Sequence, residues 1–279
     1  MGYMERSPRK RYDPKIHLPE ARSVIVCAHN YYNEPRVDDQ AGYVSIYSRG
    51  EDYHRVLKDK LQSLCDRITE LFGAFKYRIF VDSSPLGEKA LAVKAGIGFI
   101  GRNGTVIIPK RNRGVPPPGS FHFLGVIISN LELAPDSPIA GTCGKCRRCI
   151  EACPTDAIVA DGVIDAELCI SYHTTQNKGK VDEGIAAKTG NMIFGCDICQ
   201  IVCPYNKKPI VTSEPRFAPG DDMVKVDLHY LDSLSEEEFK AKFQDNSIGD
   251  IKYSMFKRSL AVALGNLDRL EQSSNRGNL

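Results

Sequence analysis

Eight of the ten cysteines lie between residues 143 and 203, and their spacing is typical of iron–sulfur ligands. The first run reads C-x2-C-x2-C-x3-C-P and comprises Cys143, Cys146, Cys149, Cys153 and Pro154. In proteins with two 4Fe–4S clusters, this pattern wraps three cysteines around one cluster and sends the fourth to the other cluster. The run therefore predicts a pair of clusters.

The second run has the spacing C-x2-C-x3-C-P and matches positions two to four of the first run. Its missing first position is Ile193, which cannot bind iron, so another thiolate is required, and Cys169 lies between the runs. For cluster one we predict the ligands Cys143, Cys146, Cys149 and Cys203. For cluster two we predict the ligands Cys153, Cys169, Cys196 and Cys199.

Zinc is the main alternative, because C-x2-C pairs also bind zinc. Zinc does not explain two C-x3-C-P units whose last cysteines cross between sites. The other two cysteines, Cys27 and Cys65, fall in apolar surroundings and are expected to be buried without a function. The chain starts without an apolar secretory segment and has no run long enough to span a bilayer. We therefore expect a cytoplasmic protein with reduced thiols and no membrane partner.

Two clusters relay electrons but bind no substrate, so the residues before them must build the reactive site. Short apolar runs predict strands at 22–28, 77–82, 105–109 and 121–129. Apolar residues at helical spacing predict a helix over 53–72, and a second helix follows Pro85 and ends at Gly96. This alternation predicts a domain of α/β type that ends near Pro135.

Over the whole chain we predict an α+β fold in three parts. These parts are a catalytic domain at 1–135, a ferredoxin-like two-cluster domain at 136–210 and a short helical tail at 211–279. In the tail, Ser235 and Glu238 match a capping box. A final apolar helix is predicted at about 251–270.

Five segments, in this order, resemble those of epoxyqueuosine reductases. They are SRGEDYHRVLKDKL (48–61), VDSSPLGEKALAVKAGIGFIGRN (81–103), CGKCRRCIEACPTDAI (143–158), CISYHT (169–174) and GCDICQIVCPYN (195–206). The resemblance runs from about Arg11 to Leu267 and includes the position of the lone Cys169. Enzymes of this family depend on cobalamin and perform the last step in making queuosine in the tRNA anticodon.

The resemblance implies that the first domain holds a base-off corrinoid beside the nearer cluster. It also implies reduction of epoxyqueuosine to queuosine in the anticodon stem-loop of tRNA, with electrons passing through both clusters to cobalt. An unidentified low-potential donor would supply the electrons, and we expect a monomer. Removing the epoxide oxygen as water takes two electrons and two protons, so an acid is needed near cobalt.

Asp82 matches the aspartate of the family motif and is the implied proton donor and corrinoid contact, with Glu88 as the second candidate. The alternative for Asp82 is an N-cap of the helix that follows Pro85. By resemblance, Tyr53 and His54 face the corrinoid or substrate pocket.

The glycine-rich stretch that contains Gly98 and Asn103 resembles the family segment whose backbone approaches the cofactor. Residues 96–101 also match the dinucleotide fingerprint G-x-G-x-x-G literally. They follow a predicted helix rather than a strand, so we reject a dinucleotide site.

Two other functions fit the same residues. One is a two-cluster electron carrier without catalysis, which stoichiometric cobalamin binding would exclude. The other is a different corrinoid-dependent reductase, such as a reductive dehalogenase, although the twin-arginine signal of exported dehalogenases is not seen here.

The sequence departs from the family pattern in four places, one of which is the loop KRNRGVPPPG (110–119), which is longer than expected. Family members usually carry a further N-terminal segment, and many carry a C-terminal helical-repeat domain that helps to hold tRNA. The family motif SYLTIE after the lone cysteine reads SYHTTQ here, at 171–176, without the glutamate.

Overall fold

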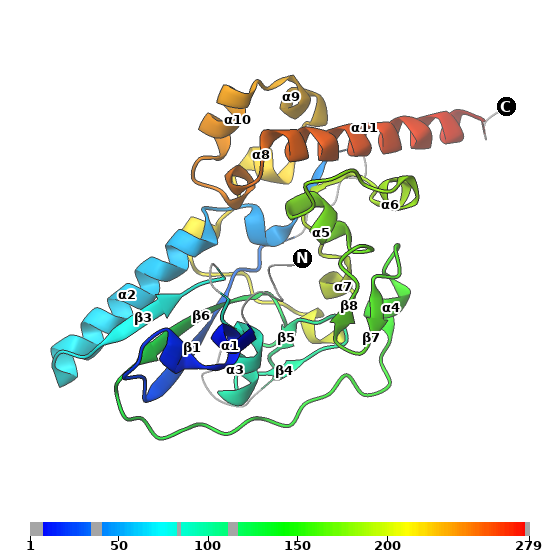
Figure 1. Ribbon diagram of the computed structural model, residues 1–279. Coiled ribbons are helices and arrows are strands. Elements are labelled where there is room, and N and C mark those ends of the chain that lie inside the picture. The colour runs from blue at the N-terminus through cyan, green and yellow to red at the C-terminus, as the bar shows by residue number, and fades with distance from the viewer. Residues whose placement is uncertain (1–7, 35–40, 83–84, 111–116, 277–279) are drawn as a thin grey trace.

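The computed structural model describes residues 8–34, 41–82, 85–110 and 117–276. A three-stranded antiparallel sheet with the order β1-β6-β3 lies at the centre of the first half (Figure 1). Its strands are β1 (Ser23–Asn30), β3 (Tyr77–Phe80) and β6 (His122–Ser129). Three of the predicted strands are therefore present, each within two residues of its expected bounds.

Helices cover both faces of this sheet, which explains why β6 is apolar along most of its length. On one face, Ile127 packs against the long helix α2 (Tyr53–Phe72) through Leu57 and Leu61. On the other face, Val126 and Ile128 pack with residues in and beside α3 (Glu88–Lys94). Alternate residues of a strand point to opposite faces, so a strand covered on both sides needs no polar face.

The remaining strands are short and pair two by two. They are β2 (Tyr43–Val44) with β9 (Met192–Phe194), β4 (Phe99–Ile100) with β5 (Val106–Ile107), and β7 (Ile158–Ala160) with β8 (Val163–Ile164). The strand predicted at 105–109 is thus limited to the two residues of β5. The β2–β9 pair is parallel and joins the first half of the chain to the cysteine-rich segment.

The helices outside the first half are mostly short. In the cysteine-rich segment they are α4 (Arg148–Glu151), α5 (Ile170–Thr175), α6 (Glu183–Lys188) and α7 (Ile198–Ile201). In the tail they are α8 (Asp221–Val224), α9 (Leu228–Ser233), α10 (Glu236–Phe243) and α11 (Tyr253–Arg276). A short α1 (Pro8–Tyr12) comes first, and single 3-10 turns lie at Pro14–Ile16, Ile46–Ser48, Pro204–Asn206, Pro215–Phe217 and Ser247–Asp250. None of the described helices is both long and apolar enough to cross a membrane.

The tail shares its core with the preceding parts. The capping box of Ser235 and Glu238 at the start of α10 is confirmed. Phe239 of α10 and Phe256 of α11 are buried in one cluster with Val44 of β2 and Phe194 of β9, among other residues. The hydrophobic core therefore continues across positions 135 and 210, where the sequence suggested boundaries.

A buried carboxylate fixes the cysteine-rich segment against the first half. Asp197 accepts hydrogen bonds from the hydroxyls of Tyr43 (2.8 Å) and Ser45 (2.6 Å) and from the backbone N–H of Ile46 (2.7 Å). Burial raises the pKa of Asp197, and these hydrogen bonds oppose the rise. The bonds are needed because an unsolvated carboxylate costs several kcal/mol unless hydrogen bonds replace its water.

The Asp197→Ala substitution is expected to lower the free energy of unfolding by about 3–5 kcal/mol, because it leaves buried donors without an acceptor. Chemical denaturation under anaerobic conditions measures this loss. Asp136→Ala is the matched control, since Asp136 is exposed, and it should change stability by less than about 0.5 kcal/mol. Equal effects of the two substitutions would contradict a structural role for Asp197.

Candidate active site and cluster sites

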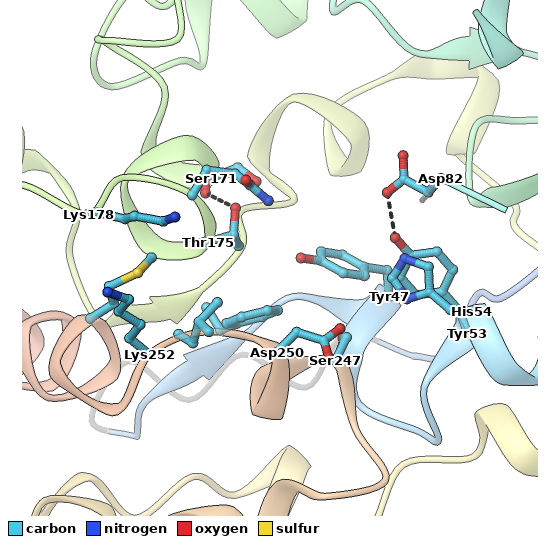
Figure 2. A pocket seen from close by; sticks show the side chains of 14 residues that line it. Tyr47, Tyr53, His54, Asp82, Ser171, Thr175, Lys178, Ser247, Asp250 and Lys252 are labelled. Carbon is cyan, nitrogen blue, oxygen red and sulfur yellow. Dashed lines mark hydrogen bonds between the residues drawn. The ribbon is translucent and has the colours of Figure 1, made fainter. Parts of the chain in front are cut away.

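A cavity of about 640 Å³ opens where α2, α5, β9 and the start of α11 meet (Figure 2). Its lining side chains are Tyr47, Tyr53, His54, Asp82, Ser171, Thr175, Gln176, Lys178, Phe194, Ser247, Asp250, Ile251, Lys252 and Met255. Tyr53 and His54 reach it because α2 begins there, where Asp52 caps the helix by accepting the N–H of His54. The cavity combines three aromatic rings with hydroxyl, carboxylate and ammonium groups.

Asp82 is held in this cavity from two sides. The hydroxyl of Tyr53 donates to Oδ2 of Asp82 at 2.6 Å (Figure 2). The backbone N–H of Asp82 donates to Oε1 of Glu88 at 2.7 Å. The backbone of Asp82 has φ of 49°, a left-handed conformation that residues other than glycine rarely adopt. Such conformations concentrate at functional sites, where the surroundings hold them in place.

The N-cap alternative for Asp82 is wrong. The helix α3 begins at Glu88, and Gly87 is the residue before it. Asp82 therefore lies too far from the helix to cap it, and its carboxyl group bonds to Tyr53 instead.

Burial controls the protonation of the groups around Asp82. It raises the pKa of Glu88 to about 7, with a further contribution from the nearby charge of Asp82 and opposition from the Asp82 N–H bond. Burial also raises the pKa of Tyr53 well above its ordinary value, and the charge of Asp82 adds to this effect. The phenol of Tyr53 thus stays neutral and remains a hydrogen-bond donor to Asp82.

His54 lies in the cavity wall and forms a hydrogen bond with Asp52. Its Nδ1 lies 2.8 Å from Oδ1 of Asp52. Burial lowers the pKa of His54, but the hydrogen bond and charge of Asp52 outweigh it and leave the pKa raised. Asp250 lies close by, and burial raises the pKa of its carboxyl group, as does the charge of Asp52.

A second cavity, of about 270 Å³, lies beside the first. Among its lining residues are all four ligands predicted for cluster two, Cys153, Cys169, Cys196 and Cys199. Burial raises the pKa of Cys196 to about 12, and the nearby thiols of Cys169 and Cys153 add to the rise. Ser171 lines both cavities, so the two adjoin. The structure thus brings together four cysteines from three segments around a space beside the larger cavity.

The ligands predicted for cluster one also lie near one another. Burial raises the pKa of the Cys149 thiol, and the nearby Cys143 and Cys203 contribute further. Burial also raises the pKa of the Cys203 thiol, and the nearby Cys143 and Cys146 add to the rise. The backbone N–H of Arg102 donates to Sγ of Cys143 at 3.4 Å. Hydrogen bonds of this kind to cluster sulfurs tune reduction potentials.

Gly98 and Asn103 lie away from the large cavity. A side chain on Gly98 would meet the carbonyl oxygen of Ile107 at 2.3 Å, so this glycine allows close packing of β4 on β5. Asn103 lines the cysteine cavity, where its amide donates to the carbonyl of Cys199 at 3.3 Å. Of the five residues predicted to bind the cofactor, the structure places Tyr53, His54 and Asp82 together in the large cavity.

Sequence analysis missed several lining residues, including Tyr47, Phe194, Lys178 and Lys252. They come from the turn after β2, from β9, from the segment after α5 and from the start of α11. None of these four residues belongs to a local sequence motif that would mark it as part of a site. Only the packing of α11 and β9 around the cavity shows that they line it. The segment 171–176, in contrast, was singled out, and three of its residues line the cavity.

A cavity in which Tyr53 orients the carboxyl group of Asp82, beside a cavity lined by four cysteines, suits an oxidoreductase of the iron–sulfur class. Family models support this class: residues 142–206 match a 4Fe-4S double cluster binding domain, and residues 11–83 match the model described as epoxyqueuosine reductase QueG, DUF1730. A curated epoxyqueuosine reductase from Francisella cf. novicida is 40% identical over 95% of this chain and 75% of its own length. The chain belongs to the epoxyqueuosine reductase family.

Solved structures agree with this assignment. A crystal structure of selenomethionine-labelled epoxyqueuosine reductase is 34% identical, with a TM-score of 0.86 over 95% of this chain and 70% of that chain. A second structure, of an epoxyqueuosine reductase with an epoxyqueuosine-modified tRNA-Tyr stem loop, is 34% identical, with a TM-score of 0.83. It covers 92% of this chain and 68% of that chain. The predicted α+β fold with a double-cluster domain is therefore confirmed.

After anaerobic reconstitution, we expect about eight irons and eight sulfides per chain. Cys169→Ala should lose about half of the iron and leave one cluster intact, because Cys169 is a predicted ligand of cluster two alone. Iron analysis and EPR of the reduced protein measure both quantities. Cys65→Ala is the matched control and should lose no iron, since Cys65 lies on the buried face of α2 among apolar residues. Full iron content in the Cys169→Ala protein would overturn the ligand sets.

Proposed function

We propose that this protein reduces epoxyqueuosine to queuosine in tRNA, with Asp82 as the proton donor. The observation that carries the proposal is the contact between two cavities. The larger cavity presents Asp82 and Tyr53, and it adjoins the cavity of the four cysteines at Ser171. Electrons from the clusters and protons from Asp82 would thus reach the same bound substrate.

The reaction requires this combination. Conversion of the epoxide to an alkene takes two electrons and two protons, and the oxygen leaves as water. A solved relative with an epoxyqueuosine-modified tRNA stem loop supports an RNA substrate. Lys178 and Lys252 on the cavity wall suit the phosphates of such an RNA.

The neighbours of Asp82 prepare it for proton transfer. Tyr53 orients the carboxyl group by donating to one of its oxygens. Glu88 fixes the backbone of Asp82 from the other side. An acid held in this way loses little orientational freedom when the substrate binds, which lowers the barrier to transfer.

We further propose that the large cavity holds a cobalamin, and the lining residues fit such a group. The rings of Tyr47, Tyr53 and Phe194 offer an apolar surface for a flat macrocycle. Hydroxyl groups, such as those of Ser171 and Thr175, suit the amide side chains around the edge of a corrin. When bound, the cobalamin would supply a strongly reducing cobalt centre beside the epoxide.

Asp82→Asn should keep both clusters and lower turnover by about a hundred- to ten-thousand-fold, because one general acid is typically worth that much. The assay follows epoxyqueuosine in an anticodon stem-loop RNA, with dithionite as the reductant. Glu88→Gln is the matched control, because glutamine still accepts the N–H of Asp82, and it should retain most activity. Normal turnover by Asp82→Asn would remove Asp82 from the mechanism. If Glu88→Gln alone were inactive, the donor role would pass to Glu88.

Cobalamin should remain bound through a desalting column and give a base-off cob(II)alamin EPR signal. Replacing Tyr47 by Ser removes one ring of the aromatic wall and should weaken retention about five- to a hundredfold, since a buried aromatic contact is worth about 1–3 kcal/mol. Iron content should stay unchanged, which separates this effect from cluster loss. A protein that retains no cobalamin would instead support a two-cluster electron carrier.

A further inference from the structure

An open groove lies beside Cys203, a predicted ligand of cluster one. It has a volume of about 500 Å³ and runs between α4 and α7, which contact each other. Its lining includes Cys203, a predicted ligand of cluster one, together with Ile201, Val202 and Pro204. Ile201 is 40% exposed, so the middle of the groove offers an apolar surface to solvent.

Arg148 and Lys207 line the groove, and further basic residues stand on the same segments of the chain. The exposed basic residues of α4, of the segment before it and of the turn after Cys203 are Lys145, Arg147, Arg148, Lys207 and Lys208. None of them forms an ion pair with a carboxylate in the described parts of the chain. Glu151 is the acidic side chain that lines the groove. Because the whole chain has a net charge of only +2, this concentration of cations is a local feature.

We propose that this groove is the docking site of a small acidic electron-carrier protein that reduces cluster one. The inference rests on the proposed function, since a reductase that turns over needs a repeated supply of electrons. An apolar centre with a charged rim is typical of transient protein interfaces, in which complementary charge speeds association. Each encounter transfers one electron, so the carrier is oxidised by one electron and cluster one is reduced by one. Two encounters supply the two electrons of the epoxide reduction.

The position of the groove favours a carrier over the RNA substrate. Cys203 lines the groove, and α7, which packs against α4 beside it, carries Cys199. Cys199 in turn lines the cavity that adjoins the Asp82 cavity at Ser171. The two cluster sites therefore separate the groove from the place where the RNA must present its epoxide.

The test uses the full chain, reconstituted with iron, sulfide and cobalamin, and the hydroquinone of an acidic flavodoxin as the probe. Stopped-flow absorbance follows cluster reduction at low and at high salt. The double substitution Arg148→Glu and Lys207→Glu should lower the rate about ten- to a hundredfold at low salt and weaken its salt dependence. Reduction by dithionite, and RNA turnover driven by dithionite, should match those of the unsubstituted protein.

Two further variants complete the test. Lys58→Glu with Lys94→Glu makes the same change in net charge on exposed positions of α2 and α3 and should leave the flavodoxin rate within about twofold. The milder double substitution Arg148→Gln and Lys207→Gln should lower the flavodoxin rate by an intermediate amount. It replaces the double glutamate variant in the test if that variant loses iron.

An unchanged flavodoxin rate in the groove variants would overturn the proposal. Weaker RNA binding combined with an unchanged flavodoxin rate would also overturn it and would identify the groove as an RNA surface. The proposed function is tested separately. Failure of dithionite-driven turnover in the unsubstituted protein would reject the reductase, whereas the cluster-reduction rates would still report on the groove.

Discussion

The buried carboxylate of Asp197 is the constraint on which the arrangement of the site depends. It lies next to Cys196 in the chain and accepts three hydrogen bonds from the segment 43–46. Because a buried charge is tolerated only with such bonds, they favour the observed position of the cysteine-rich segment against the first half. This position aligns β2 with β9 and brings Tyr47 and Phe194 into the wall of the large cavity, next to the space lined by the cysteines.

In the proposed function, electrons and protons would enter the larger cavity from different directions. The cysteine cavity adjoins it at Ser171, whereas Asp82 enters from the end of β3 together with Tyr53 from the start of α2. This separation would allow clusters to stay buried while the proposed acid, Asp82, faces the substrate. Cys149 and Cys203 are likewise buried, and as ligands of cluster one they would keep water away from a reduced centre.

The geometry of Asp82 illustrates how the fold supports a strained residue. A left-handed backbone at aspartate costs roughly 1–3 kcal/mol and persists only where contacts compensate for it. Here the contacts are the phenol of Tyr53 and the carboxylate of Glu88, from two helices that cover opposite faces of the same sheet. The raised pKa of Glu88, about 7, reflects the burial that this support requires.

The sequence by itself predicted the double-cluster domain, the long helix of residues 53–72 and the capping box at Ser235. Each follows from the spacing of residues within a short segment. Asp82 could also be named as a candidate from the sequence, because it matches a motif of the family. Only the tertiary structure decided that Gly98 packs on Ile107, that Asn103 faces the cysteines, and that Lys178 and Lys252 reach the larger cavity. It alone showed that one core crosses positions 135 and 210. These features arise from contacts between segments far apart in the chain, and such contacts leave no local pattern of residues from which they could be predicted.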